Sequence, residues 1–328
     1  MKSTALAHPN IALVKYWGKR DDALNLPATG SYSLTLAPIR TVTSVEWGQN
    51  EDSLSLNGQA QSGRPLTRIQ RFLDLIREGR PELGFARVES ENDFPTAAGL
   101  ASSSSAFAAL ALAATSAAGI DENPYALSAL ARRGSGSAAR SLFGGFVQMH
   151  PGSRSDGLDA QAEPRFDKDH WDLRVLFALT AVGEKDVSST EGMDHTVATS
   201  PYFKEWVLAV PDALLEADAA VAARDFARLA ACAEASALQM HASAMAATPG
   251  VLYWNGGTVE LIHAVRRMRA QGLPVFFTID AGPHVKVFVE AHAAANVRAI
   301  LEQVPGVKGV FEAAPGGPAR ILREGERA

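Results

Sequence analysis

The sequence predicts an α+β protein built from two domains. Its 328 residues are many for a single core, so one large or two medium domains are expected. Alternating polar and apolar stretches in the first part of the chain predict an antiparallel sheet with helices behind it. After residue 171, strand-like and helix-like segments alternate as in a split βαβ, ferredoxin-like unit. We therefore expect a first domain at residues 1–170 and a second at residues 171–328.

The first domain is expected to begin with strands. Apolar runs or alternating patterns predict them at residues 11–16, 30–36, 41–47 and 87–90. Asn57 and Gly58 are a strong turn signal, so residues 54–62 are expected to form a hairpin. Apolar residues with helical spacing predict a helix at residues 68–77.

Further elements follow up to and beyond the domain boundary. Helical patterns occur at residues 106–119, 125–133, 212–247 (two helices or one bent helix), 258–271 and 293–303. Strands are expected at residues 146–149, 173–182, 275–279 and 307–313, with a short final strand after the P-G-G-P turn. Residues 151–168 are rich in Gly, Asp, Ser and Arg without periodicity, so we expect a surface loop there.

Composition narrows the class of protein. The net charge is -5 and no cluster of Lys and Arg is present, which argues against a nucleic-acid surface, although a local basic site for a small anion stays possible. Cys232 is the only cysteine, so no internal disulfide can form and a reducing cytoplasm is the expected compartment. Residues 97–120 are apolar, but their serines and abundant Ala favour a buried helix over a membrane span.

A candidate phosphate site lies at residues 92–105, which read N-D-F-P-T-A-A-G-L-A-S-S-S-S. A turn containing Pro95 and Gly99 leads to four consecutive serines at the start of a predicted helix. The free N–H groups and the dipole at a helix N-terminus stabilise an anion, and Ser hydroxyls add donors. The alternative is an N-capped, Ala-rich core helix whose serines only satisfy backbone donors.

Two further segments have the residue types of an anion site. Residues 15–20 read K-Y-W-G-K-R, and three cations beside two aromatic rings suit a partly desolvated phosphate. Residues 132–141 read R-R-G-S-G-S-A-A-R-S, in which Arg140 needs an anionic partner to be more than a surface charge. The alternatives are a solvated strand end with extended Lys side chains for the first, and a helix C-cap with a linker for the second.

Asp280 is the candidate general base. It follows a predicted buried strand and precedes a Gly-Pro turn, so a rigid element would present its carboxylate to a loop. The alternative is an Asp that stabilises its own turn. The polar segment at 183–193, G-E-K-D-V-S-S-T-E-G-M, by itself indicates no more than the cap of the next helix.

Several of these segments carry a resemblance to a known family. P-T-A-A-G-L-A-S-S-S resembles the phosphate-binding loop of the GHMP kinase superfamily, and in this wording that of the diphosphomevalonate decarboxylase family. The segments R-R-G-S-G-S-A-A-R-S and F-F-T-I-D-A-G-P extend the resemblance over most of the chain. It implies a GHMP-kinase-like fold, with an ATP-binding first domain like domain 2 of ribosomal protein S5 and a ferredoxin-like second domain that carries substrate and catalysis.

The resemblance also implies ATP and Mg²⁺. The loop would contact the ATP phosphates, through Pro95, Ala98, Gly99, Leu100, Ala101, Ser102, Ser103, Ser104 and Ser105. Magnesium would be held mainly by phosphate oxygens, with Ser103 as the candidate protein ligand. In addition, the resemblance implies a homodimer, whereas the composition predicts a cytoplasmic protein without a nucleic-acid or membrane partner.

The roles implied for the other residues are those of a decarboxylase acting on mevalonate 5-diphosphate. Asp280 would activate the tertiary hydroxyl, Lys15 would stabilise charge near the transferred phosphoryl group, and Arg140 would bind the substrate carboxylate. The remaining substrate contacts are assigned to Tyr16, Lys19, Ser135, Ser137, Ser188 and Ser189. His284 stands where the family more often has Asn. A monophosphate substrate, another GHMP-type kinase activity and a nucleotide-binding module without catalysis are the alternatives.

Overall fold

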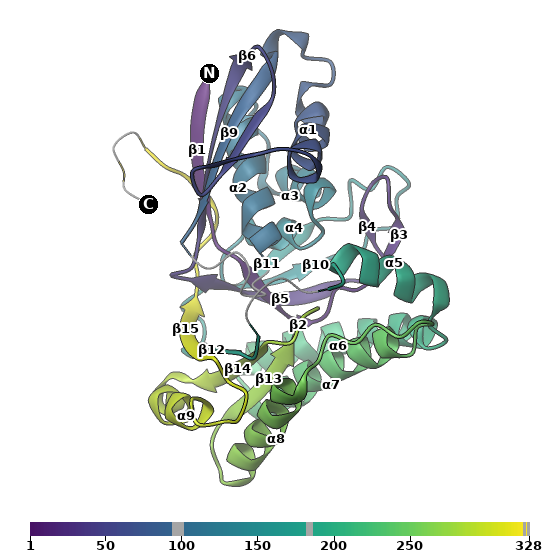
Figure 1. Cartoon of the computed structure of the whole chain (residues 1–328), viewed down its shortest axis with the longest axis vertical. Coiled ribbons are helices and arrows are strands. Elements are labelled where there is room, and N and C mark those ends of the chain that lie inside the picture. Colours follow the sequence, from purple (N-terminus) through teal and green to yellow (C-terminus); the bar gives the residue numbers. More distant parts are fainter. Residues whose placement is uncertain (94–101, 182–185, 324–325, 327–328) are drawn as a thin grey trace.

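The computed structural model describes residues 1–93, 102–181, 186–323 and 326. It is an α+β protein with two domains, one above the other in Figure 1, as the sequence predicts. The first contains a six-stranded sheet in the order β16-β1-β6-β9-β7-β8. Its strands are β1 (Lys2–Ala7), β6 (Thr41–Gln49), β7 (Ser53–Leu56), β8 (Gln59–Gln61), β9 (Phe85–Asn92) and β16 (Arg320–Ile321). Asn57 and Gly58, both with positive φ, form the predicted turn between β7 and β8.

Helices cover one face of this sheet (Figure 1). They are α1 (Arg64–Arg77), α2 (Ser102–Ala117), α3 (Pro124–Gly134) and the single turn α4 (Ala138–Ser141), with a 3-10 turn at Pro81–Leu83. The alanines of α2 allow it to pack closely on β1 and β6, and Ala108, Ala109 and Ala111 have no exposed surface. The Trp47 indole N–H donates to the Ala114 carbonyl at 3.0 Å, so this aromatic side chain is both buried and satisfied.

A second, eight-stranded sheet joins the two domains. Its order is β11-β10-β5-β15-β12-β14-β13, and β2 also pairs with β5. The strands are β2 (Asn10–Val14), β5 (Ser31–Ala37), β10 (Phe146–Met149), β11 (Ala162–Phe166), β12 (Leu173–Leu179), β13 (Val275–Ile279), β14 (Val285–Glu290) and β15 (Gly309–Pro315). All of these pairings are antiparallel. The order β15-β12-β14-β13 within the chain sequence β-α-β-β-α-β confirms the ferredoxin-like prediction.

The second domain supplies the other helices. They are α5 (Ser189–Thr199), α6 (Phe203–Ala223), α7 (Phe226–Met245), α8 (Gly256–Ala270) and α9 (Ala294–Leu301), with a 3-10 turn at Ala291–Ala293. The long Ala-rich segment forms two helices because Arg224 adopts a left-handed conformation and Asp225 caps α7. Cys232 on α7 is buried and its thiol donates to the Ala213 carbonyl, and burial raises its pKa to about 11. Among the helices that the structure describes, none has the length and apolar content needed to cross a membrane.

The structure corrects the sequence prediction in several places. The prediction of a loop throughout residues 151–168 is wrong, because β11 occupies Ala162–Phe166 and pairs with β10. Strands β1 and β14 were not predicted, nor were the short strands β3 (Lys19–Asp21) and β4 (Leu26–Pro27). β14 is the consequential omission, because it brings a lysine against the carboxylate of Asp280.

Candidate active site

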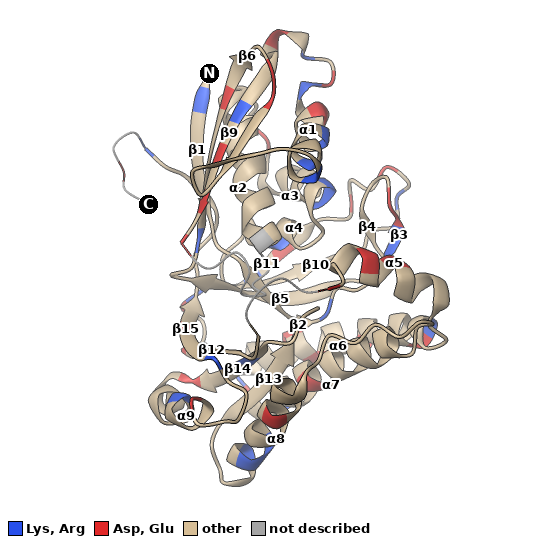
Figure 2. Cartoon of the chain, in the orientation of Figure 1, with Lys and Arg blue, Asp and Glu red and all other residues tan. Residues whose placement is uncertain are grey.

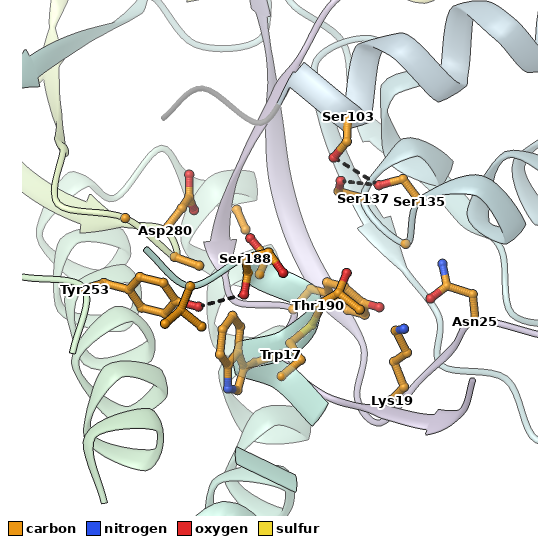
Figure 3. A pocket seen from close by; sticks show the side chains of 18 of the residues that line it. Trp17, Lys19, Asn25, Ser103, Ser135, Ser137, Ser188, Thr190, Tyr253 and Asp280 are labelled. Carbon is orange, nitrogen blue, oxygen red and sulfur yellow. Dashed lines mark hydrogen bonds between the residues drawn. The ribbon is translucent and has the colours of Figure 1, made fainter. Parts of the chain in front are cut away.

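A cavity of about 1580 Å³ lies where the two domains meet. Its lining includes these predicted site residues: Lys15, Tyr16, Lys19, Ser103, Ser135, Ser137, Arg140, Ser188, Ser189 and Asp280. Figure 3 shows side chains from both domains facing this space. Seven Lys and Arg side chains but only three Asp belong to the described lining, so the cavity is basic within an acidic protein. Three of these cations, Arg64, Arg68 and Arg71, lie within α1, where Figure 2 shows several basic residues.

Lys15 and Asp280 form a buried ion pair at the cavity wall. Lys15 follows β2 and Asp280 follows β13, and Lys15 Nζ lies 2.6 Å from Asp280 Oδ1 although 265 positions separate them. Burial lowers the pKa of Lys15 to about 8, and the nearby cations Lys286 and Arg140 act in the same direction. Burial alone would raise the pKa of Asp280, but Lys15 and Lys286 outweigh it and hold that pKa well below its usual range. Asp280 is therefore ionised at neutral pH and can accept a hydrogen bond or a proton at the cavity.

Arg140 is a buried cation whose hydrogen-bond partners among the described residues are all neutral. From α4 its guanidinium donates to Ser31 Oγ at 2.5 Å, Ser33 Oγ at 3.0 Å and Asn10 Oδ1 at 3.1 Å. Among the ion pairs of the described residues, none includes Arg140. Burial lowers its pKa to about 10, which still leaves it charged at neutral pH. A buried charge without a counter-ion that faces a cavity is well suited to bind a carboxylate or phosphate.

The serines of the two predicted anion segments meet in the structure. Ser135 Oγ lies 3.3 Å from both Ser103 Oγ and Ser137 Oγ (Figure 3). Tyr16 approaches the same segment, and its buried hydroxyl has no hydrogen-bond partner among the residues that the structure describes. A side chain at Gly136 would place its Cβ only 2.5 Å from the Tyr16 hydroxyl oxygen, so the close approach of Tyr16 requires glycine. These groups place four hydroxyls close together at the cavity, where a ligand could exchange hydrogen bonds with them.

The remaining substrate-binding candidates also lie at the cavity. Lys19 Nζ is 3.3 Å from the exposed Asp22 carboxylate. Ser188 caps α5 by accepting from the Glu191 N–H, so its side chain has the structural role that the polar pattern indicates. The Tyr253 hydroxyl donates to the Ser188 carbonyl at 3.2 Å, which fixes this corner of the cavity (Figure 3). Ser189 lines the cavity beside it.

Little of the predicted phosphate loop can be located. Pro95, Ala98, Gly99, Leu100 and Ala101 lie outside the described residues, as does the Ser102 side chain. Ser104 and Ser105 are completely buried in α2, away from the described lining of the cavity. Ser105 Oγ is 2.7 Å from Thr41 Oγ1, which ties α2 to β6. Of the four consecutive serines, Ser103 is the described side chain at the cavity.

Three residues near the site were not assigned roles from the sequence. Lys286 interrupts the apolar run of β14, and a lone charge in such a run is the signal that could have revealed it. Asn10 accepts from Arg140 and donates to Ser141 Oγ at 2.7 Å, so it orients the guanidinium. His284 Nδ1 accepts from the Thr180 N–H at 3.1 Å. Burial lowers the pKa of His284 to about 4, so the neutral ring carries its proton on Nε2.

Comparisons with known proteins agree with this geometry. Residues 7–162 match a model described as "Diphosphomevalonate decarboxylase-like N-terminal domain", and residues 175–315 match "Mevalonate 5-diphosphate decarboxylase C-terminal domain". The diphosphomevalonate decarboxylase of Eremothecium gossypii is 37% identical over 94% of this chain and 83% of its own. A structure described as "MDDEF in complex with MVAPP, AMPPCP and Magnesium" is 40% identical, with a TM-score of 0.91 over 98% of this chain and 99% of that one. Mevalonate diphosphate decarboxylase from Staphylococcus aureus is 36% identical, with a TM-score of 0.92 over 98% of both chains.

These likenesses place the fold among the GHMP-kinase-like, two-domain α+β proteins. The matched models together span most of the sequence, and the identities extend over nearly the whole chain. The chain belongs to the diphosphomevalonate decarboxylase family.

Proposed function

We propose that this protein converts mevalonate 5-diphosphate to isopentenyl diphosphate, with ATP as the phosphoryl donor and ADP, phosphate and carbon dioxide as the other products. One observation carries the proposal: the ionised Asp280–Lys15 pair and the Arg140 guanidinium, which pairs with no described carboxylate, face the same basic cavity. A tertiary alcohol needs a group that accepts its proton, and a neighbouring carboxylate needs a cation. The cavity offers both.

The residues present fit ATP and Mg²⁺, which are bound as AMPPCP and magnesium in the related MDDEF structure. Ser103 lines the cavity and belongs to the first turn of α2, where free N–H groups and the helix dipole favour binding of phosphate. Ser103 is also the candidate magnesium ligand. Ser102, Ser104, Ser105 and the predicted contacts within residues 95–101 remain proposals. When bound, ATP supplies the phosphoryl group that turns the hydroxyl into a leaving group, and magnesium offsets charge on the phosphates.

The substrate would be held at both of its ends. Arg140 would bind the carboxylate, because its planar fork matches two carboxylate oxygens and its charge has no other described counter-ion. Tyr16 and Lys19 would hold the diphosphate, and the Tyr16 hydroxyl, which has no partner within the described part of the chain, would gain an acceptor. The hydroxyls of Ser135, Ser137, Ser188 and Ser189 complete the proposed set of donors.

Asp280 and Lys15 would act on the reacting hydroxyl. Asp280 accepts the hydroxyl hydrogen bond and takes the proton as the oxygen forms its bond to phosphorus, the point at which that proton becomes acidic. Lys15 stabilises the negative charge that develops on the transferred group. The phosphate then leaves with the electron pair of the C3–O bond. The bond between the carboxylate carbon and the carbon next to C3 breaks, and its electron pair forms the new double bond to C3. Arg140 keeps that carboxylate aligned until it leaves.

Several broader assignments are part of the same proposal. We assign nucleotide binding to residues 1–170, and substrate binding and catalysis to residues 171–328, with Lys15 and Arg140 supplied by the first domain. The break between the two family models near residue 170 supports this division. We also propose a cytoplasmic homodimer, which sedimentation would detect as about twice the 34.7 kDa chain mass.

Release of ADP and carbon dioxide by the purified protein tests the proposal. With Mg-ATP, the account expects both products in equal amounts from mevalonate 5-diphosphate and neither from mevalonate 5-phosphate. Both products from the monophosphate would change the assigned substrate. Release of ADP without carbon dioxide would make the protein a kinase. If neither compound gave any product, the protein would instead be a nucleotide-binding module without catalysis.

A further inference from the structure

Lys286 is a buried lysine that the proposed reaction does not use directly. It belongs to β14, and its side chain is 1% exposed among neighbours that include Val285 and Val287. Removing an ammonium group from water is strongly unfavourable unless a partner compensates for it. The position therefore needs an explanation beyond strand packing.

The partner of Lys286 is the far oxygen of Asp280. Lys286 Nζ lies 3.3 Å from Asp280 Oδ2, and 3.5 Å from the His284 carbonyl oxygen. Asp280 Oδ1 is contacted by Lys15 at 2.6 Å. Lys15 lines the cavity, whereas Lys286 does not belong to its described lining. The carboxylate therefore stands between one lysine at the cavity and one behind it.

We propose that Lys286 is a positioning residue for Asp280, which fixes the orientation of the carboxylate and keeps it ionised while Lys15 engages the substrate. This inference rests on the proposed function. A multiply charged anion in the cavity would attract Lys15 and would by itself favour protonation of Asp280. Lys286 opposes this protonation, because it does not belong to the described cavity lining and stays paired with Oδ2 when Lys15 moves toward the anion.

The other charged or titratable groups around Asp280 do not replace Lys286. Arg140 on α4 acts at a distance and is oriented by Asn10 and the serines of β5. His241 on α7 contacts the Ile279 carbonyl, and burial lowers its pKa to about 3, so it is neutral. His284 is also neutral, with its Nδ1 engaged by the Thr180 N–H. Only the two lysines form ion pairs with Asp280 among the described residues.

Two substitutions separate the charge of Lys286 from its position. Lys286→Met has similar length, removes the buried charge and suits the apolar strand, so the variant should fold. Lys286→Gln keeps a donor for Oδ2 without the charge. Thr278→Val is the matched control, because Thr278 is the cross-strand neighbour of Lys286 in β13 and carries no charge.

The first readout is the titration of Asp280 by ¹³C-carboxyl NMR, with the signal assigned by its loss in Asp280→Asn. The second is the pH dependence of carbon dioxide release. In Lys286→Met, we expect the Asp280 pKa to rise by at least about one unit, because one adjacent cation is lost. We expect kcat to fall about 10- to 100-fold, with the acid limb at higher pH and little change in KM. Lys286→Gln should show the same pKa shift with a smaller loss of kcat, and Thr278→Val should show neither.

Unchanged Asp280 titration and pH profile in folded Lys286→Met would overturn the inference and leave Lys286 a packing residue. A change in KM alone would also overturn it, because a positioning role acts on the bound state. If the unsubstituted protein releases no carbon dioxide, the proposed function fails, while the NMR titration still decides whether Lys286 controls Asp280.

Discussion

Replacing Arg140 by Met tests whether the buried guanidinium serves the substrate or the fold. Its three hydrogen bonds reach neutral groups on Asn10, Ser31 and Ser33, and no described carboxylate would be left unpaired by its removal. We therefore expect the free energy of unfolding to change by less than about 2 kcal/mol.

The expected effect on catalysis is much larger. A bidentate guanidinium–carboxylate contact contains two charge-assisted hydrogen bonds, each worth about 1.5–3 kcal/mol. Their loss in the transition state would amount to about 3–6 kcal/mol, or a fall in kcat/KM of about two to four orders of magnitude. Steady-state assays of carbon dioxide release measure this fall, and thermal unfolding measures stability in the same samples.

Arg132→Met is the matched control. Arg132 is also 2% exposed, but it donates to the carbonyls of Leu24, Gly157 and Ala160 and does not belong to the described cavity lining. Its removal takes a donor from three backbone carbonyls, which cannot reorient, whereas the Ser31 and Ser33 hydroxyls left by Arg140→Met can rotate to other partners. The Arg132 variant should therefore lose about 2–4 kcal/mol of stability and retain kcat/KM when folded. If Arg140→Met kept kcat/KM within about threefold of the unsubstituted protein, the carboxylate would be bound elsewhere and the reasoning would be refuted.

The remaining predictions concern the ion pair and the metal. Asp280→Asn should lower kcat at least about 1000-fold while AMPPCP binding, measured by calorimetry, stays nearly intact; retained turnover would remove the proton-acceptor assignment. Burial lowers the pKa of Lys15 to about 8, so kcat/KM should fall above about pH 8 as the ammonium deprotonates. Lys15→Arg should move this alkaline limb of the pH profile to higher pH. If the limb stays in place, the titration belongs to another group. The pKa of Lys15 is near 10.5 in the unfolded chain and about 8 in the folded protein, so between these pH values the unfolded state binds more protons. The contribution of Lys15 to the free energy of unfolding should therefore rise with pH between about 8 and 10.5, which denaturation at several pH values would show. EDTA should abolish ADP release and added Mg²⁺ restore it; activity that persists in EDTA would contradict a magnesium requirement.

Local patterns predicted most of the fold. The Asn57-Gly58 hairpin and the ferredoxin-like order of the second domain depend on turn chemistry and on periodic apolar residues, which are written in short stretches of sequence. β11 was missed because Pro164 and its charged neighbours resemble a loop, and only pairing with β10 makes the segment a strand.

The site depended more on contacts between distant segments. Residue types indicated Lys15, Arg140 and Asp280 separately, but only the fold places Lys15 and Asp280 2.6 Å apart. Lys286 was missed because its significance comes from the neighbouring strand. Conversely, four consecutive serines look alike in sequence, while helix geometry buries Ser104 and Ser105 and leaves Ser103 at the cavity.

The most direct test follows the oxygen of the reacting hydroxyl. Mevalonate 5-diphosphate labelled with ¹⁸O at the C3 hydroxyl would be turned over with Mg-ATP, and the released phosphate analysed by mass spectrometry. If the hydroxyl is phosphorylated before the carboxylate leaves, each phosphate released should carry one ¹⁸O atom. Label found in water, with unlabelled phosphate, would contradict phosphorylation of the hydroxyl and with it the roles proposed for Asp280 and Lys15.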